Sequence, residues 1–220
     1  MHTALVTGAS RGIGAAIVKR LMADGHTVLA PTRQEMDLES NTSIDAYLSR
    51  IKNQVDILVN DAGINRISIL NEIKDQDLEE TLQINLVAPL RIIRDVSPHM
   101  QQKRFGRILN ISSVWSIVSR TGRASYSMSK AALNSMTRSL AVELAPDNIL
   151  VNAIAPGYVM TDLTRRNNSP EELDKINQTI PLGRLAEPQE IAAVAAFLCS
   201  EQNTYLTGQI IVVDGGYTCL

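Results

Sequence analysis

The sequence has little of several residue types on which other classes of protein depend. Only two cysteines, Cys199 and Cys219, occur among 220 residues, so neither a disulfide framework nor a cysteine-rich metal site is expected. The three histidines, His2, His26 and His99, have no carboxylate or cysteine partners at ligand spacing. We expect them to be ordinary surface or cap residues, and we expect no metal. The absence of a Gly-x-Ser-x-Gly motif argues against a hydrolase with a nucleophile elbow.

Long hydrophobic runs and an excess of one charge are also missing. No apolar run reaches the length of a membrane span, and the chain does not open with a signal peptide, so we expect a cytoplasmic protein without a membrane partner. A formal net charge of -2 gives no reason to expect nucleic acid as a partner. With 45% hydrophobic and 20% charged residues, the composition is that of one globular domain covering residues 1–220.

Short apolar runs alternate with segments of helical periodicity along the whole chain. The runs are continuously rich in Val, Ile and Leu, which is typical of strands covered on both faces. The expected strands are Ala4–Thr7, Thr27–Ala30, Asp56–Asn60, Arg107–Ser112, Leu150–Ala155 and Gln209–Val213. The expected helices are Gly12–Asp24, Leu78–Gln101, Ala124–Leu144 and Pro188–Cys199. This alternation predicts an α/β fold, a Rossmann-type doubly wound parallel sheet with helices on both faces and ligands at the carboxyl ends of the strands.

One connection is too short for a complete crossover. Only residues 31–36 separate the second strand from Asp37-Leu38, whereas a parallel crossover that contains a helix needs about a dozen residues. The third strand is therefore a short remnant, or the connection is a bare loop.

A glycine-rich loop, Thr7-Gly8-Ala9-Ser10-Arg11-Gly12-Ile13-Gly14, follows the first strand and opens a helix. Gly8 allows a tight turn, Gly12 lets the backbone approach a pyrophosphate, and Gly14 lets the helix pack closely on the sheet. The free N–H groups at the helix start favour phosphates. A glycine-rich turn without a ligand is the alternative, but the position between a strand and a helix favours nucleotide binding.

From this loop onwards the chain resembles the short-chain dehydrogenase/reductase family. The loop has the family's Thr-Gly-x-x-x-Gly-x-Gly pattern, and the later motifs follow in the family's order. They are Val59-Asn60-Asp61-Ala62-Gly63, Asn85, Ser113, Tyr126-x-x-x-Lys130, Pro156-Gly157 and the tail Thr207-Gly208-Gln209…Asp214-Gly215-Gly216. Asp61 departs from the asparagine that the family usually has there.

The resemblance implies a catalytic group. Tyr126 and Lys130 are four residues apart on one helix and therefore share a face. Tyr126 is expected to act as the general acid/base, with Lys130 favouring its phenolate and holding the nicotinamide ribose. Ser113, rather than the neighbouring Ser112, would orient the substrate oxygen. Asn85 would complete a proton relay or, alternatively, serve only as a structural amide.

The residues at the end of the second strand favour NADPH over NADH as the cofactor. The end of the second strand, Leu29 to Arg33, carries no carboxylate to bind ribose hydroxyls, while Arg33 and Arg11 are cations that suit a 2′-phosphate. Both arginines could instead be solvated surface charges. By resemblance, Asp37 and Leu38 flank the adenine, and the Val159 backbone and the Thr161 hydroxyl hold the carboxamide.

The remaining expectations concern substrate, lid and assembly. Residues from about 157 to 182 would form a mobile substrate lid, or merely a tethered loop. Trp115 is either core or a wall of the substrate pocket. Within the family, the chain is most similar to 3-oxoacyl-[acyl-carrier-protein] reductases, which implies reduction of a 3-oxoacyl thioester. Lys103, Arg104 and Arg107 are expected to meet an acyl carrier protein near the active-site mouth.

Two alternatives to the thioester substrate remain open. One is a dehydrogenase of a sugar or another small secondary alcohol, and the other is a cofactor-binding protein without turnover. The long helices and the last strand resemble the family's association surfaces, which implies a homotetramer, with a dimer as second choice.

Overall fold

The protein is described by a computed structural model of residues 1–220, with the side chains of residues 163 and 167 left out. The strands are β1 (Thr3–Thr7), β2 (Thr27–Leu29), β3 (Ile57–Asn60), β4 (Gly106–Ile111), β5 (Ile149–Pro156) and β6 (Ile210–Val213). The helices are α1 (Gly12–Ala23), α2 (Asn41–Ile51), α3 (Asp75–Leu82), α4 (Ala88–Lys103), α5 (Ala124–Leu144), α6 (Asp162–Asn167), α7 (Pro170–Gln178) and α8 (Pro188–Cys199). No described helix is long and apolar enough to cross a membrane.

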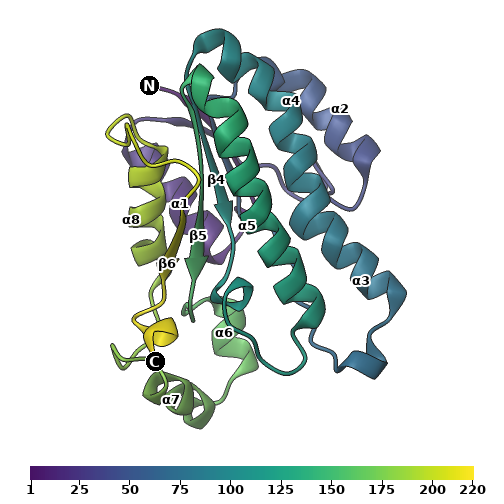
Figure 1. Ribbon diagram of the computed structural model, residues 1–220, viewed down its shortest axis with the longest axis vertical. Coiled ribbons are helices and arrows are strands. Elements are labelled where there is room, and N and C mark those ends of the chain that lie inside the picture. The colour runs from purple at the N-terminus through teal and green to yellow at the C-terminus, as the bar shows by residue number, and fades with distance from the viewer.

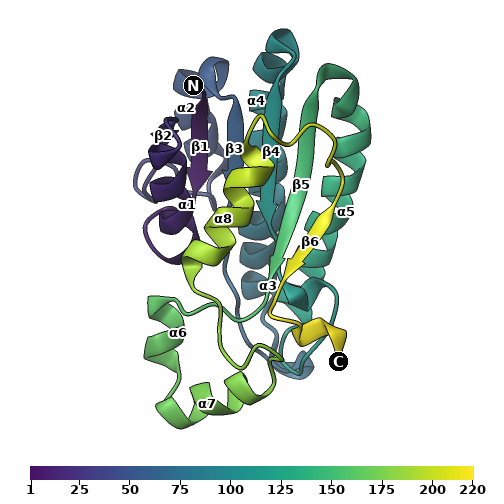
Figure 2. The ribbon, with the colours of Figure 1, turned by 90° about the vertical axis from the view of Figure 1, so that its left-hand side faces the viewer.

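The strands form one sheet in the order β2-β1-β3-β4-β5-β6, and every neighbouring pair is parallel. Helices α1 and α8 cover one face, and α2, α4 and α5 cover the other (Figures 1 and 2). The predicted α/β fold, the expected strands and the helices covering both faces are confirmed. The chain leaves β1 for β2 on one side and returns to β3 on the other, so the switch point of the sheet lies between β1 and β3.

The short connection after β2 contains no third strand. Residues 30–40 form a loop in which the backbone N–H groups of Glu35 and Met36 both bond the Thr32 carbonyl. The loop leads into helix α2, which the sequence analysis did not predict because its segment is mostly polar. Ser40 caps this helix by accepting a hydrogen bond from the Ser43 N–H at 3.2 Å.

The helix predicted over Leu78–Gln101 is interrupted. Helices α3 and α4 are joined by a π-helical turn over Gln83–Val87, which contains Asn85. A π turn widens the helix by one residue, and such turns occur frequently at functional sites. The periodicity of the apolar residues is too coarse to detect one inserted residue.

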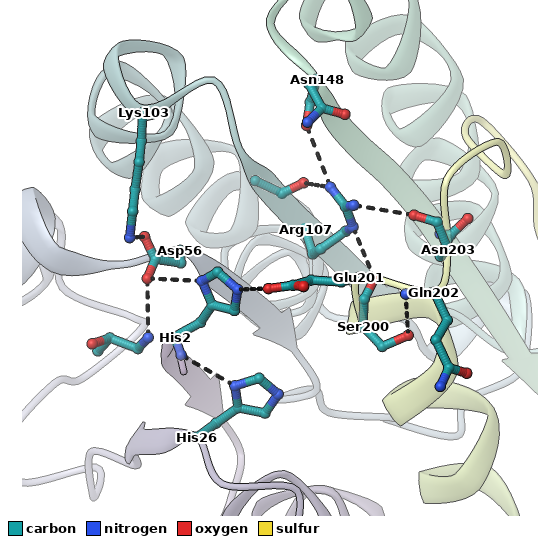
Figure 3. Close-up of polar contacts among 12 residues, drawn as sticks. His2, His26, Asp56, Lys103, Arg107, Asn148, Ser200, Glu201, Gln202 and Asn203 are labelled. Atoms are coloured by element: carbon teal, nitrogen blue, oxygen red, sulfur yellow. Dashed lines mark hydrogen bonds and ion pairs between the residues drawn. The ribbon is translucent and has the colours of Figure 1, made fainter.

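The three histidines, expected to be ordinary surface or cap residues, come together at the amino ends of the strands. His2 lies between two carboxylates, with Nε2 at 2.8 Å from Glu201 and Nδ1 at 3.4 Å from Asp56 (Figure 3). The His2 backbone N–H donates to His26 Nδ1 at 3.3 Å, and His99 Nε2 lies 3.4 Å from Asp56. In the described part of the chain, no group of three or more His, Cys, Asp or Glu side chains is placed to hold a metal ion.

Asp56 is the centre of this polar cluster. Burial acts to raise the pKa of its carboxyl, but hydrogen bonds from Lys103 Nζ at 2.6 Å and from the Thr3 backbone at 3.1 Å hold that pKa below its usual value. Arg107 lies beside the cluster and is almost fully buried, with its guanidinium donating to the backbone carbonyls of Asn148, Ser200 and Asn203 (Figure 3). The cluster therefore joins the first strand, the end of α4 and the segment after α8.

Candidate active site

Two adjoining cavities follow the carboxyl ends of β1 and β3. The first has a volume of about 420 Å³ and extends from the glycine-rich loop to the loop after β2. The second, of about 510 Å³, reaches Ser113, Tyr126 and Lys130. Both are lined by Arg11, Ile13, Arg33, Asp61, Gly63 and Ile64. They therefore form one elongated site at the switch point of the sheet.

The glycine-rich loop has the predicted geometry. Gly8 and Gly12 adopt φ angles of 71° and 58°, in the left-handed region that favours glycine. A Cβ atom at Gly14 would lie 2.5 Å from the Gly8 carbonyl oxygen, so only glycine allows the helix to start this close to the loop. Gly8, Ser10, Gly12 and Ile13 line the first cavity, which leaves the N-terminus of α1 facing it.

Asp61 lies against this loop. A Cβ atom at Gly14 would also be 2.5 Å from Asp61 Oδ2, and the Gly14 N–H donates a hydrogen bond to the carboxylate. Burial raises the pKa of Asp61 to about 7, although the charge of Lys130 and the Gly14 hydrogen bond both act to lower it. The acid that replaces the usual asparagine is thus a titratable group in the wall of both cavities.

At the other end of the first cavity, Arg33 is not free. Its guanidinium is paired with Glu39, and its Nε lies 3.6 Å from Asp37 Oδ1. The segment from Leu29 to Arg33 carries no carboxylate, and the acids that meet this arginine come from further along the chain. The sequence analysis considered only the residues up to Arg33, whereas the short loop brings Glu39 back to it. Leu38 and Asp37 line the cavity as expected.

Ser113, Tyr126 and Lys130 come together as the sequence predicted. Ser113 follows β4, and a hydrogen bond with it acts to lower the pKa of Tyr126. Ser112 instead contacts Ser116 Oγ at 3.3 Å and the Lys130 carbonyl at 3.4 Å. Lys130 Nζ lies 5.8 Å from the centre of the Tyr126 ring and donates to the Ile111 carbonyl at 2.7 Å.

The pKa values of this group are shifted by their surroundings. Burial raises the pKa of Tyr126, the Ser113 hydrogen bond and the Arg123 charge act to lower it, and Asp61 raises it further. Burial lowers the pKa of Lys130 to about 8, although Asp61 acts in the opposite direction. A buried lysine and a buried tyrosine whose pKa values are shifted and that line one cavity are typical of a site of proton transfer.

Asn85 and Gly63 complete the floor of the site. Asn85 is buried and exchanges hydrogen bonds with the Ile64 backbone, its Oδ1 accepting and its Nδ2 donating at 2.9 Å each, and its Nδ2 also donates to Ser129 Oγ at 3.0 Å. A Cβ atom at Gly63 would lie 3.2 Å from Asn85 Oδ1 and 3.4 Å from Lys130 Nζ. Because Gly63 has no side chain, the space next to Asn85 Oδ1 and Lys130 Nζ stays free.

The other predicted residues fall into two groups. Ala62 and Thr161 line the first cavity, and Pro156 and Gly157 line the second. Gly14, Asn60, Asn85 and Val159 line neither cavity. The Asn60 amide donates to Asn110 Oδ1 at 2.9 Å across the sheet, and the Val159 carbonyl accepts the Thr161 N–H at 2.9 Å.

Several lining residues were missed, among them Thr7, Thr32, Met36, Glu39, Ile64 and Ile84. Thr7 could have been predicted as a site residue from the sequence, because it ends β1 immediately before the glycine-rich loop. Its Oγ1 accepts the N–H groups of Asp61 and Ala62 at 3.2 Å each and so holds the ends of β1 and β3 together.

The basic residues Lys103, Arg104 and Arg107 do not lie at the mouth of the site. They flank the first residue of β4, whereas Ser113 follows the other end of this strand. Lys103 pairs with Asp56, Arg107 is buried, and Arg104 lies 3.4 Å from Asp147. Within one chain, the expectation that this cluster borders the active site was wrong.

The chain belongs to the short-chain dehydrogenase/reductase family. A family profile described as enoyl-(acyl carrier protein) reductase matches residues 30–218, and one described as short chain dehydrogenase matches residues 2–43. The 3-oxoacyl-[acyl-carrier-protein] reductase of Aquifex aeolicus is 41% identical over 237 residues, which cover 96% of this chain and 95% of that protein.

Solved structures show the same fold over the whole chain. A putative NAD(P)-dependent gluconate 5-dehydrogenase from Beutenbergia cavernae, crystallised with NADP at low occupancy, is 33% identical with a TM-score of 0.94, covering 100% of this chain and 97% of that one. A putative gluconate dehydrogenase from Agrobacterium tumefaciens is 32% identical with a TM-score of 0.90, covering 100% and 96%. The family that the sequence motifs indicated is therefore confirmed.

Proposed function

We propose that this protein is an NADPH-dependent oxidoreductase that reversibly reduces a ketone to a secondary alcohol, with a 3-oxoacyl thioester as the leading substrate. The observation that carries the proposal is the placement of Tyr126 beside Ser113 and Lys130 in the cavity that continues from the glycine-rich loop. Similarity to 3-oxoacyl-[acyl-carrier-protein] reductases over nearly the whole chain supports the thioester, carried by an acyl carrier protein.

The elongated site fits a dinucleotide. The α1 N-terminus and the loop from Gly8 to Ile13 would hold the pyrophosphate, Leu38 would lie against the adenine, and Arg11 and Arg33 would hold a 2′-phosphate. The open floor at Gly63 leaves room for the nicotinamide end above Lys130 and Asn85. When bound, NADPH supplies the hydride that the reduction requires.

Tyr126 is the proposed general acid/base. Its neutral phenol, favoured by burial, is the form that can donate a proton to the oxygen of a ketone as that oxygen gains negative charge. Ser113 would donate a second hydrogen bond to the same oxygen and share its charge. In the reverse direction, the Lys130 ammonium would favour the phenolate that removes the proton.

Asn85, Thr161 and the lid are supporting parts of this proposal. The Asn85 amide is fully engaged with Ile64 and Ser129, so it would hold the site's floor and support a proton relay rather than contact substrate. Val159 and Thr161 would hold the carboxamide. Helices α6 and α7 lie beyond the carboxyl ends of the strands (Figure 2), which suits a substrate lid over residues 157 to 182.

A second candidate function is oxidation of a small secondary alcohol of the sugar-acid type. Both solved structures described above are of putative gluconate dehydrogenases, and one of them was crystallised with NADP. A homotetramer, with a dimer as the alternative, and a cytoplasmic location are further parts of the proposal.

Turnover of acetoacetyl-N-acetylcysteamine tests the function. We expect wild-type protein to consume NADPH faster than NADH, and Tyr126→Phe to reduce turnover at least about a hundred-fold while leaving NADPH binding intact. Full activity of Tyr126→Phe would contradict the mechanism. NADPH binding without turnover of any ketone or secondary alcohol would instead identify a binding protein. Tyr126-dependent oxidation of sugar acids alone would favour the second candidate.

A further inference from the structure

Two arginines without carboxylate partners lie on the segment that connects β4 to α5. Among the ion pairs of the described residues, none involves Arg120 or Arg123, whereas Arg66, Arg91 and Arg184 are each paired with an acid. Arg123 is partly buried, and this burial, with repulsion from Arg120, lowers the pKa of its guanidinium. Arg120 is exposed and Arg123 is partly buried, and a negative charge that joined them would relieve their mutual repulsion.

Three aromatic rings hold these arginines in place. The rings of Trp115, Tyr158 and Tyr217 pack edge to face, with centroids 6.0, 6.1 and 5.6 Å apart. The Arg123 guanidinium lies 5.8 Å from the Trp115 ring centre, and Arg120 Nη1 donates to the Tyr158 hydroxyl at 3.2 Å. Cations fixed on rigid rings lose little freedom on binding a ligand.

This cluster borders the proposed site of reaction. The Trp115 backbone N–H donates to Ser113 Oγ at 3.3 Å, and Tyr158 directly follows Gly157, which lines the same cavity as Ser113 and Tyr126. Arg123 precedes Tyr126 by one helical turn, and its charge acts on the pKa of that phenol. An anion held by these guanidinium groups would therefore lie beside the cavity that contains Ser113 and Tyr126.

The position of the charge distinguishes between anions. A 3-oxoacyl thioester has no charge near its keto carbon, and the phosphate of a pantetheine arm lies at the far end of that arm. A carboxylate attached to a short carbon chain places a charge near the keto carbon, and guanidinium groups bind carboxylates well.

We propose that Arg120 and Arg123 form a subsite for a free carboxylate, so that the protein also reduces small oxo acids and oxidises the corresponding hydroxy acids. The inference rests on the proposed ketone chemistry at Tyr126 and extends its substrate range. In the reduction, the carbonyl carbon gains a hydride from NADPH and the carbonyl oxygen gains the Tyr126 proton. NADP⁺ and the hydroxy acid are the products, Tyr126 takes back a proton from water, and the carboxylate is unchanged.

The first test compares oxo acids with neutral partners. NADPH consumption is measured with oxo acids that have one, two or three carbons between carbonyl and carboxylate, each beside its methyl ester, and with the neutral acetoacetyl-N-acetylcysteamine. We expect one acid to be preferred over its ester. In Arg120→Gln, kcat/KM for that acid should fall about ten- to a hundred-fold, mainly through KM, while the thioester changes less than about two-fold. Arg123→Gln also removes a charge that acts on the pKa of Tyr126, so it should lower turnover of the thioester as well, but the acid should lose clearly more than the thioester.

Arg50→Gln is the matched control. Arg50 is exposed and its guanidinium also lies over an aromatic ring, that of Tyr47 at 5.3 Å, but on helix α2. This variant should treat acids and esters as the wild type does. An equal loss for acid, ester and thioester in the Arg120 and Arg123 variants would overturn the subsite.

A binding measurement separates this inference from the proposed function. Trp115 is the single tryptophan, so its fluorescence reports on the subsite. With NADP⁺ present, titration with 3-hydroxybutyrate should change the emission, and the neutral 3-hydroxybutyramide should not. Loss of the difference in Arg123→Gln supports the subsite even if turnover fails. Equal responses to acid and amide in the wild type would overturn it, even if the thioester is reduced.

Discussion

Asp61 lies between the glycine-rich loop and Lys130, so its charge acts on two parts of the site. As a carboxylate it helps to keep Lys130 protonated, but it also places a negative charge beside the backbone N–H groups that would bind a pyrophosphate. The pKa of Asp61, raised by burial to about 7, puts the change between these two states at neutral pH. An asparagine at this position would keep the shape of the side chain without its charge.

We expect NADPH binding to weaken as the pH rises through about 7, because Asp61 is then ionised beside an anionic ligand. The effect should be about 1 kcal/mol, or about five-fold in Kd, for a charge a few ångströms away in a partly wet site. Asp61→Asn should bind NADPH more tightly than the wild type at pH 8 and about equally at pH 5.5. Titration of NADPH fluorescence across this range measures both.

Ionisation of the cofactor's own phosphate affects NADPH binding by the wild type and by Asp61→Asn equally. The difference between the two proteins therefore reports on Asp61 alone. Binding of NADPH at pH 7 should also take up a proton in the wild type and less in Asp61→Asn, which calorimetry in buffers of different ionisation enthalpy detects. Parallel pH profiles for the two proteins would show that another group is responsible.

Motifs could predict which residues meet in the site, but not their partners. Ser113, Tyr126 and Lys130 were predicted from the resemblance to the family's motifs, and the strand end and the helix spacing agreed with placing them together. The Arg33–Glu39 pair depends on the path of an irregular loop, and the histidine cluster depends on three chain segments that no local spacing relates. The shift of Asp61 depends on burial, which a motif does not reveal.

At the scale of elements, continuous apolar strands were predictable because burial on both faces leaves a clear pattern. Helix α2 was missed although Ile44, Leu48 and Ile51 repeat at helical spacing, because polar residues surround them. The π turn at Asn85 could not be predicted, since one added residue hardly changes the periodicity. The connection after β2 was recognised as too short to contain a helix, but the path that this loop takes along the first cavity could not be predicted.

This loop runs directly from β2 to α2 and brings Glu39 to Arg33. The carboxylate competes with a 2′-phosphate for the guanidinium, so cofactor discrimination depends on both side chains. We expect Arg33→Ala to weaken NADPH roughly ten-fold with little change for NADH. Glu39→Gln should tighten NADPH about two- to three-fold, since the pair it removes is exposed. Fluorescence titrations with both cofactors measure these changes, and equal weakening of NADPH and NADH by Arg33→Ala would refute the assignment.

At the scale of the molecule, the two ends of the sheet serve different purposes. The carboxyl ends of the strands hold the cavities and the helices α6 and α7, and the C-terminal turn with Tyr217 also lies there (Figures 1 and 2). The amino ends are closed by Asp56, the histidines and Arg107, which join distant segments through buried polar contacts.

Exposed apolar side chains on two other surfaces point to self-association. Val87, Leu90 and Val142 are exposed beside or on α4 and α5, and Phe197 and Val212 are exposed on α8 and β6. Apolar residues gathered on the surfaces of long helices and an edge strand are typical of interfaces between subunits. Two separate surfaces of this kind would join four copies, whereas one would join two.

We therefore expect light scattering to give about four times the 24.1 kDa mass of the chain. Val142→Asp on α5 and Val212→Asp on β6 should each reduce the mass to that of a dimer, because each places charge in one of the two surfaces. Met22→Asp, at an equally solvent-facing apolar position on α1, is the control and should leave the mass unchanged. A monomeric mass for the wild type would refute the predicted assembly. If the wild type is a dimer and only one of the two variants makes it monomeric, the protein has a single interface, at the surface that this variant changes.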